Sequence, residues 1–286
     1  MNGSCEAVKI FASVPTMEGA GVKLRRGIGV SEAPSFDPFL LFDDFSGEDP
    51  ADYVAGFPWH PHRGIETVTY LIRGDVEHGD SIGNSGSIGP GQVQWMTAGG
   101  GVIHQEMPQP VEGGMVGFQL WVNLPAKDKL MAPRYRDITA DQIPTVEVDG
   151  GSVKVIAGRF RGVEGPVREI VRSPWYFDVT VEAGRFLTLD IPTDFFTFLY
   201  IFEGEGRIGE SGSNVASKHI VKLSGGDHLK ILGGSDGMRF LLMSGEPIGE
   251  PVAWRGPIVM NTEEELELAF YEFRNGTFIK KGKNYT

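Results

Sequence analysis

Residues 56–66 read Gly-Phe-Pro-Trp-His-Pro-His-Arg-Gly-Ile-Glu, and the two histidines in this stretch indicate both a fold and a chemistry. Side chains alternate between the two faces of a β-strand, so His60 and His62 face the same way in an extended segment. Two neutral imidazoles on one face provide half of a transition-metal site. The stretch therefore predicts a strand that carries part of a metal centre.

The other half of this centre is predicted from residues 99–106, Gly-Gly-Gly-Val-Ile-His-Gln-Glu. His104 and Glu106 have the same spacing, so they also share one strand face. Three imidazoles and one carboxylate suit Fe(II), Mn, Co, Ni, Cu or Zn, and the lack of a nearby cysteine argues against a structural zinc–thiolate site. Four protein ligands on a six-coordinate ion leave two positions open, enough for a bidentate substrate or for a substrate and dioxygen.

Several neighbouring residues have a structural interpretation beside a functional one. Glu66 has an even offset from His62, so it shares the face of the histidines only if no bulge intervenes. We expect His78 and Asp80 to stabilise a turn rather than form a second metal site. Gly99 to Gly101 are expected to adopt a turn with positive φ that delivers His104. The candidates for an apolar pocket near the ion are Phe39, Phe42, Phe45, Phe57, Trp59, Trp95 and Met96.

Composition restricts the class of protein. The 286 residues are 41% hydrophobic and 22% charged, as in a globular protein, and their net charge of −12 argues against broad binding to nucleic acid. No apolar run approaches the ~20 residues needed to span a bilayer, and Met1 to Glu6 do not resemble a secretory signal. With Cys5 as the single cysteine, we expect a cytoplasmic protein, or a nuclear one in a eukaryote.

The pattern of strands predicts an all-β fold. Residues 67–73, 118–124, 175–181 and 197–202 are rich in β-formers and are separated by Gly and Pro turns, which is typical of a sandwich or barrel. A helix is expected only near the end, where Thr262 precedes three glutamates. The halves resemble each other, and an approximate alignment sets Asp190 and Pro192 against His60 and His62. It sets Arg239 and Leu241 against His104 and Glu106.

These motifs resemble the pirin family of two-domain cupins. The resemblance rests on His-Pro-His-Arg-Gly-Ile-Glu-Thr-Val (60–68), on residues 93–108, on Gln-Leu-Trp-Val-Asn-Leu-Pro (119–125) and on Gly-Pro-Ile-Val-Met-Asn (256–261). It implies a bicupin of two jelly-roll-type antiparallel β-barrels in tandem with a short C-terminal helix. Residues 1–138 would form the metal-binding barrel and residues 139–286 a barrel without ligands. The ion would be iron, bound by His60, His62, His104 and Glu106. Because the carboxylate ligand of the family corresponds to Glu106, Glu66 would support the ligands or the fold. Gln92 departs from the general cupin pattern, which has an acidic residue at that position, but it is not a ligand position.

The same site supports two functional hypotheses. The first is a quercetin 2,3-dioxygenase-like enzyme that acts on a small flavonol-like aromatic enol and dioxygen, with Glu106 as the base for the substrate hydroxyl. The alternative is a non-catalytic, redox-sensing regulatory protein that acts as a transcription cofactor through a protein partner. For both we expect one divalent transition metal per chain, Fe(II) first, no direct contact with nucleic acid or membrane, and a monomer. An open aromatic-lined channel to the ion would favour the enzyme.

Overall fold

The computed structural model describes residues 3–168 and 170–280, which form two compact units. The first unit comprises Val14–Ala140 and the chain from Ile248 onward, and the second comprises Asp141–Pro247 and the residues up to Ser13. The sequence predicted a division between residues 138 and 139, with the N-terminal segment in the first unit and the C-terminal segment in the second. The structure instead assigns the residues up to Ser13 to the second unit and the chain from Ile248 onward to the first. The pattern of strands along a sequence does not indicate which sheet a terminal strand joins.

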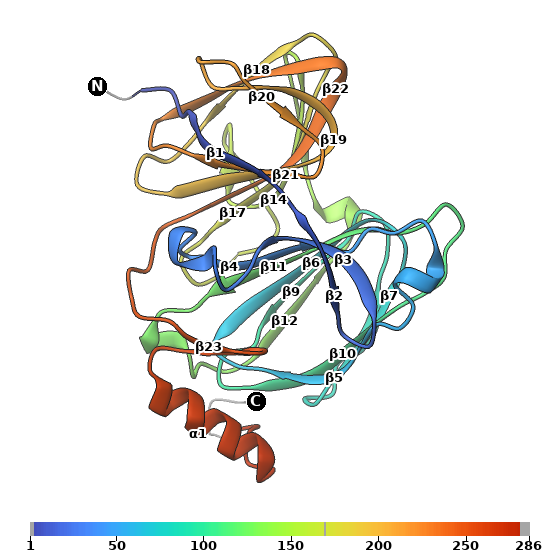
Figure 1. The fold of residues 1–286 in the computed structure, drawn as a ribbon, viewed down its shortest axis with the longest axis vertical. Coiled ribbons are helices and arrows are strands. Elements are labelled where there is room, and N and C mark those ends of the chain that lie inside the picture. Colours follow the sequence, from blue (N-terminus) through green and yellow to red (C-terminus); the bar gives the residue numbers. More distant parts are fainter. Residues whose placement is uncertain (1–2, 169, 281–286) are drawn as a thin grey trace. The chain divides into compact units, whose positions relative to one another are not determined.

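The first unit is built from two antiparallel sheets that place the histidine strands (Figure 1). The seven-stranded sheet has the order β12 (Arg134–Ile138), β9 (Val93–Thr97), β6 (Ile65–Arg73), β11 (Val116–Asn123), β4 (Phe39–Asp44), β3 (Val22–Ile28) and β2 (Val14–Glu18). The four-stranded sheet has the order β5 (Phe57–His62), β10 (Val102–Pro108), β7 (Val76–Asp80) and β8 (Ser85–Ile88). Both predicted halves of the metal centre therefore lie in one sheet, on β5 and β10.

The tail of the chain completes the first unit. It contains β23 (Ala253–Arg255), β24 (Ile258–Met260) and helix α1 (Glu263–Arg274). The helix begins with the expected capping box, in which the Thr262 hydroxyl accepts from the Glu265 backbone N–H and the Glu265 carboxylate accepts in return. Its buried Leu266 and Ala269 pack with Phe278.

The second unit is a nine-stranded antiparallel sheet. Its main order is β1 (Ala7–Ala12), β21 (His219–Leu223), β19 (Phe196–Ile208), β22 (His228–Gly245), β17 (Trp175–Val181), β14 (Gly151–Ala157) and β13 (Thr145–Val148), with β18 (Phe186–Asp190) on β22 and β20 (Ser213–Ala216) on β19. Short β15 (Arg159–Phe160) and β16 (Val163–Glu164) pair beside it. Aliphatic and aromatic side chains fill its interior.

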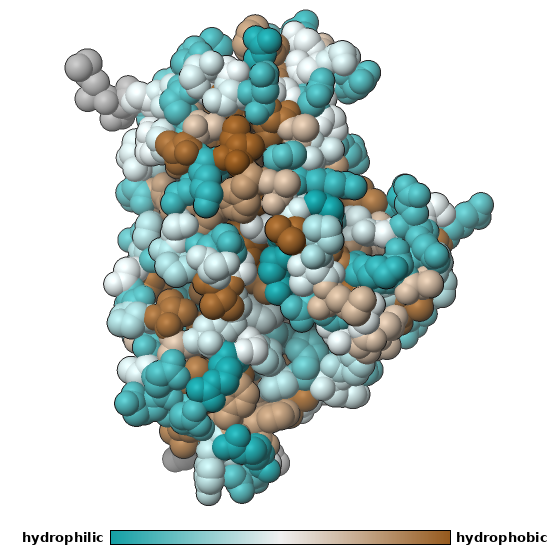
Figure 2. Space-filling model, in the orientation of Figure 1, coloured by the Kyte–Doolittle hydropathy of each residue, from teal (hydrophilic) through white to brown (hydrophobic). Residues whose placement is uncertain are grey.

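The remaining regular elements are short 3-10 helices in the connections. They are η1 (Ala33–Ser35), η2 (Pro50–Asp52), η3 (Ala126–Asp128) and η4 (Ala140–Gln142). The all-β prediction is confirmed, as are all four predicted strands and the single predicted α-helix among the described residues. In that part of the chain, no helix has both the length and the hydropathy required to cross a membrane. The face in Figure 2 shows hydrophobic residues interspersed with hydrophilic ones.

Candidate metal centre

Strands β5 and β10 bring three histidines together. In their antiparallel ladder His104 lies directly opposite His60, and His62 lies opposite Val102. The ring centroids are 4.4 Å apart for His60 and His104, 5.0 Å for His62 and His104, and 4.8 Å for His60 and His62. One nitrogen from each ring falls within 4.8 Å of the others, a group that could hold a metal ion. The prediction that these three side chains meet is confirmed.

Backbone carbonyls orient two of the imidazoles for metal binding. The Nδ1 atom of His60 lies 2.9 Å from the Pro58 carbonyl oxygen, and that of His62 lies 3.0 Å from the Pro257 carbonyl oxygen. A carbonyl only accepts, so each Nδ1 carries the hydrogen and each Nε2 presents a lone pair. These two Nε2 atoms face each other at 3.0 Å. Two facing lone pairs are stabilised by a cation that binds both, so the arrangement fits a metal.

The third imidazole, that of His104, is also suited to metal binding. His104 is buried, and its Nε2 has no hydrogen-bond partner among the described residues, while its Nδ1 lies 3.5 Å from the Tyr135 hydroxyl. Burial lowers the pKa of His62 and of His104 well below the ordinary histidine value. Both rings are therefore neutral near pH 7, which is the form that binds metals.

Gly99 and Gly101 adopt the backbone turn that the sequence predicted before His104. Their φ angles are +49° and +142°, where residues with a side chain are strained. A Cβ atom on Gly99 would lie 2.2 Å from the Met131 carbonyl oxygen. Glycine is required here because the backbones approach closely.

Glu106 lies near the histidines on β10. One of its carboxylate oxygens is 4.0 Å from His104 Nε2, and the other accepts a hydrogen bond from the Thr69 hydroxyl at 2.9 Å. The register shift between His104 and Glu106 lies on β5, where the step from His60 to Phe57 spans three residues against two on β10. Strand β10 keeps its alternation, so His104 and Glu106 share one face. Burial raises the pKa of the Glu106 carboxyl group. The carboxylate lines the same cavity as His60 and His62.

Other candidate residues have structural roles. Glu66 lies three positions before Thr69 on β6, so it faces away from Glu106, and it accepts a hydrogen bond from Thr97 at 2.6 Å. Asp80 accepts from the backbone N–H groups of Ile82 and Asn84 and so stabilises a turn. Within the described residues, the three histidines are the only metal-binding group of this kind.

A cavity of about 590 Å³ opens beside the candidate ligands, lined by His60, His62 and Glu106 together with apolar side chains. Of the aromatic residues considered from sequence, Phe45 and Phe57 line it. Phe42 lies opposite Leu120 on the face of the sheet away from the cavity, Trp95 lies opposite Val68 on that face, and Trp59 is 54% exposed.

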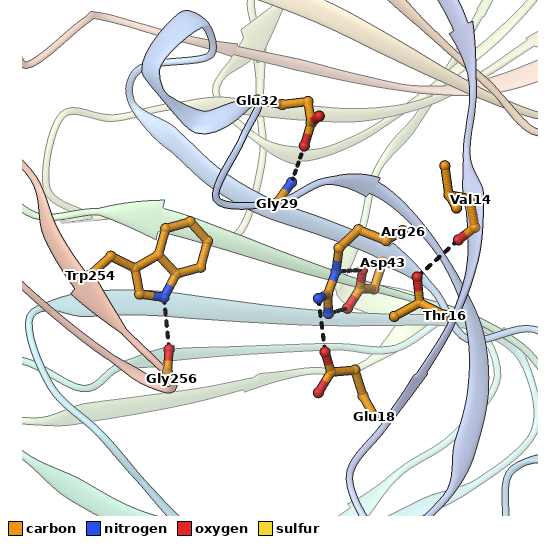
Figure 3. A network of polar contacts seen from close by, with 9 residues as sticks. All are labelled: Val14, Thr16, Glu18, Arg26, Gly29, Glu32, Asp43, Trp254 and Gly256. Atoms are coloured by element: carbon orange, nitrogen blue, oxygen red, sulfur yellow. Dashed lines mark hydrogen bonds and ion pairs between the residues drawn. The ribbon is translucent and has the colours of Figure 1, made fainter.

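Sequence reasoning missed two tryptophans of the cavity wall. Trp121 packs edge-on against His62 at 5.0 Å between ring centroids, and Trp254 lies 5.9 Å from Trp121. The Trp254 N–H donates to the Gly256 carbonyl (Figure 3). Alternation with Gln119 along β11 could have identified Trp121. No local signal places Trp254, which comes from the tail.

The second unit repeats the ladder order of the first but has no ligands at the equivalent place. Strand β10 pairs with β5 and β7, and the first part of β22 pairs in the same way with β18 and the end of β19. The inward pairs on β18 and β22 are Leu187 with Ile231 and Leu189 with Leu229, all in the apolar core.

This correspondence corrects the alignment made from sequence. Asp190 is the last residue of β18, just as His62 is the last residue of the equivalent strand β5. Pro192 lies beyond β18. Arg239 and Leu241 lie in the later part of β22, which pairs with β17, so they correspond to β11 rather than to His104 and Glu106. The alignment was wrong because β22 runs without interruption where the first unit has two strands.

Two antiparallel β units, one with a histidine cluster that could hold a metal ion beside a cavity, define a protein of the two-domain cupin class. The pirin family profile matches residues 21–122, and the profile of the pirin C-terminal cupin domain matches residues 176–279. The chain belongs to the pirin family.

Relatives cover almost the whole chain. A Pseudomonas aeruginosa protein named "putative quercetin 2,3-dioxygenase" is 44% identical over 277 residues, which cover 95% of this chain and 97% of the relative. A pirin-like protein of Caulobacter vibrioides is 45% identical over 273 residues, 95% of this chain and 98% of the relative. The crystal structure of a quercetin 2,3-dioxygenase from Acinetobacter baumannii superposes with a TM-score of 0.87 at 31% identity, covering 96% of this chain and 98% of that one.

Proposed function

We propose that this protein is a metal-dependent dioxygenase of the quercetin 2,3-dioxygenase type, with Fe(II) held by His60, His62, His104 and Glu106. The observation that carries the proposal is the cavity that reaches three of these four residues and has tryptophan side chains in its wall. A regulatory site without substrate does not require such a cavity. The names of the Pseudomonas aeruginosa relative and of the superposed structure support the same activity.

The residues around the cavity have separate tasks in this proposal. A bound divalent ion supplies Lewis acidity and one-electron chemistry toward dioxygen. Glu106 takes the proton of the substrate's enolic hydroxyl, since it is the only carboxylate among the four proposed ligands and lines the cavity. Thr69 holds this carboxylate through a hydrogen bond. The rings of Trp121 and Trp254 provide an apolar wall and exclude water.

The test is the loss of quercetin's visible absorbance in the presence of dioxygen and protein reconstituted with one metal at a time. Glu106→Gln should reduce the rate at matched metal content by about 10² or more, the usual contribution of a general base. Glu77→Gln is the matched control, because this carboxylate lies on the neighbouring strand β7 and is exposed. No turnover with Fe, Mn, Co, Ni or Cu would refute the proposal and favour the regulatory role.

A further inference from the structure

A row of polar residues crosses the interior face of the seven-stranded sheet, starting next to the metal centre. Thr69 on β6 lies directly opposite Gln119 on β11, which lies opposite Asp43 on β4, which in turn lies opposite Arg26 on β3. Directly opposed residues of antiparallel strands share one face of the sheet. All four line the cavity. We call them the polar row.

The polar row begins at the candidate ligand Glu106. The Thr69 hydroxyl oxygen lies 2.9 Å from a Glu106 carboxylate oxygen and 2.7 Å from the Gln119 side-chain amide. The atom of Gln119 placed next to Thr69 is the amide oxygen, but a hydroxyl has one hydrogen and cannot donate to two acceptors. With the Gln119 amide turned by 180°, Thr69 donates to the carboxylate and accepts from the amide N–H. The amide oxygen of Gln119 then remains available to a ligand in the cavity.

The other end of the polar row is a charged cluster (Figure 3). Arg26 donates two hydrogen bonds to Asp43, of 2.9 and 2.7 Å, and one of 2.8 Å to Glu18 on β2. Both oxygens of Asp43 are thus occupied. Arg26 keeps two of its five N–H groups, and the second carboxylate oxygen of Glu18 has no protein partner among the described residues. The Glu18 side chain is 43% exposed.

Apolar side chains flank the polar row. Leu41 lies opposite Trp121, one row away on the same face, and Phe45 and Leu24 also line the cavity. From Thr69 to Arg26 the row crosses three strand spacings, about 14 Å in all. A flat molecule longer than a single aromatic ring therefore finds apolar walls for its faces and hydrogen-bonding groups along one edge.

We propose that the polar row binds the hydroxylated edge of an elongated aromatic substrate, and that Glu18 and Arg26 select a hydroxyl over a carboxylate at its end away from the metal. The inference rests on the proposed function for the identity of the substrate. A phenolic hydroxyl donates to the unoccupied oxygen of Glu18 and accepts from Arg26. A carboxylate on the ligand has no hydrogen to donate. It is also repelled, because the combined negative charge of Glu18 and Asp43 exceeds the positive charge of Arg26.

The experiment compares three ligands that differ only at the para position of the pendant phenyl ring. They are unsubstituted flavonol, its para-hydroxy derivative and its para-carboxy derivative. Dissociation constants are measured without dioxygen on metal-reconstituted protein, by quenching of tryptophan fluorescence. The wild type should bind the hydroxy derivative about 10- to 100-fold more tightly than the unsubstituted flavonol, as expected for hydrogen bonds to charged groups. The carboxy derivative should bind most weakly.

Two variants at Glu18 test the selection directly. Glu18→Ala leaves the pair of Arg26 and Asp43 intact and should bring the ratio of the affinities for the hydroxy derivative and for unsubstituted flavonol close to one. Glu18→Gln keeps an acceptor and removes the charge, so it should reduce the penalty on the carboxy derivative. Lys23→Gln is the matched control, because Lys23 is 63% exposed on β3 and pairs with Asp52 outside the cavity.

Equal affinities for the three ligands in the wild type, or unchanged ratios in Glu18→Ala, would overturn the inference. The proposed function is tested separately by adding dioxygen to the wild type. Turnover of all three flavonols with equal affinities would overturn only the role of Glu18 and Arg26. Selective binding without turnover would support the polar row and refute the dioxygenase.

Discussion

Arg63 joins three segments of the first unit, and Arg63→Met is expected to loosen the tail and the metal centre together. Its side chain is 3% exposed. The guanidinium donates to the Gly100 carbonyl at 2.8 Å, to the Phe278 carbonyl at 2.7 Å and to the Glu272 carboxylate at 2.7 Å. It also lies 4.2 Å from the centre of the Phe278 ring. Methionine fills much of the volume but satisfies none of these acceptors.

The size of the effect follows from the groups left behind. Removing one partner of a buried ion pair costs about 3–5 kcal/mol, and Glu272 keeps a second partner in Lys280, which favours the lower end. Two carbonyls also lose a charged donor. We expect the free energy of unfolding to fall by about 4 kcal/mol. Because the tail supplies the Pro257 carbonyl that orients His62, metal affinity should fall about 10- to 100-fold.

The assay is urea unfolding of the metal-free protein, followed by titration with metal. Arg255→Met is the matched control, since Arg255 is 51% exposed and pairs with Glu263 and Glu267 on the helix surface. That change should leave both the free energy of unfolding and the metal affinity nearly unchanged, because exposed ion pairs contribute little. Equal stability losses in the two variants, or full metal affinity in Arg63→Met, would refute the reasoning.

Three further predictions concern the same unit. Elemental analysis should find one transition-metal ion per chain, and His62→Ala should abolish tight binding without changing the circular dichroism; two tightly bound ions would contradict this. Thr69→Val keeps the shape of the side chain but removes the hydrogen bond to Glu106, so metal titration should show about 10-fold weaker binding, whereas Thr67→Val should not. Burial lowers the pKa of Lys129 to about 7 from 10.5, so the unfolded state binds more protons between these values and the free energy of unfolding should rise with pH across this range. Urea unfolding at several pH values should show a flatter dependence for Lys129→Met, and an unchanged slope would refute the assignment.

Features that depend on one strand, or on two paired strands, could be predicted from the sequence. The spacing of His60 and His62 requires only that the segment be extended, and the turn before His104 is encoded by its glycines. The strand segments and the capped helix are likewise local. This is why the fold class and the histidine cluster agree with the structure.

Features that depend on register or on distant contacts could not be predicted. Pro257 accepts the hydrogen bond of His62 across 195 positions of the chain, and Trp254 reaches the cavity from the same tail. The sheet face on which Glu66 lies depends on the turn at Gly64. The sheet face on which Phe42 lies depends on how β4 and β11 align. No spacing rule contains that information.

The hydrogen bond between His62 and the Pro257 carbonyl also affects the order in which the site forms during biosynthesis. A ribosome releases His60, His62 and His104 long before Pro257, so a nascent chain exposes all three imidazoles while His62 still lacks its carbonyl partner. The finished geometry arises only after the second unit has been translated and the last segment has returned to the first. The orientation of His62 is therefore completed only after translation, and a polypeptide that stops near residue 140 would lack the carbonyl that orients this ring.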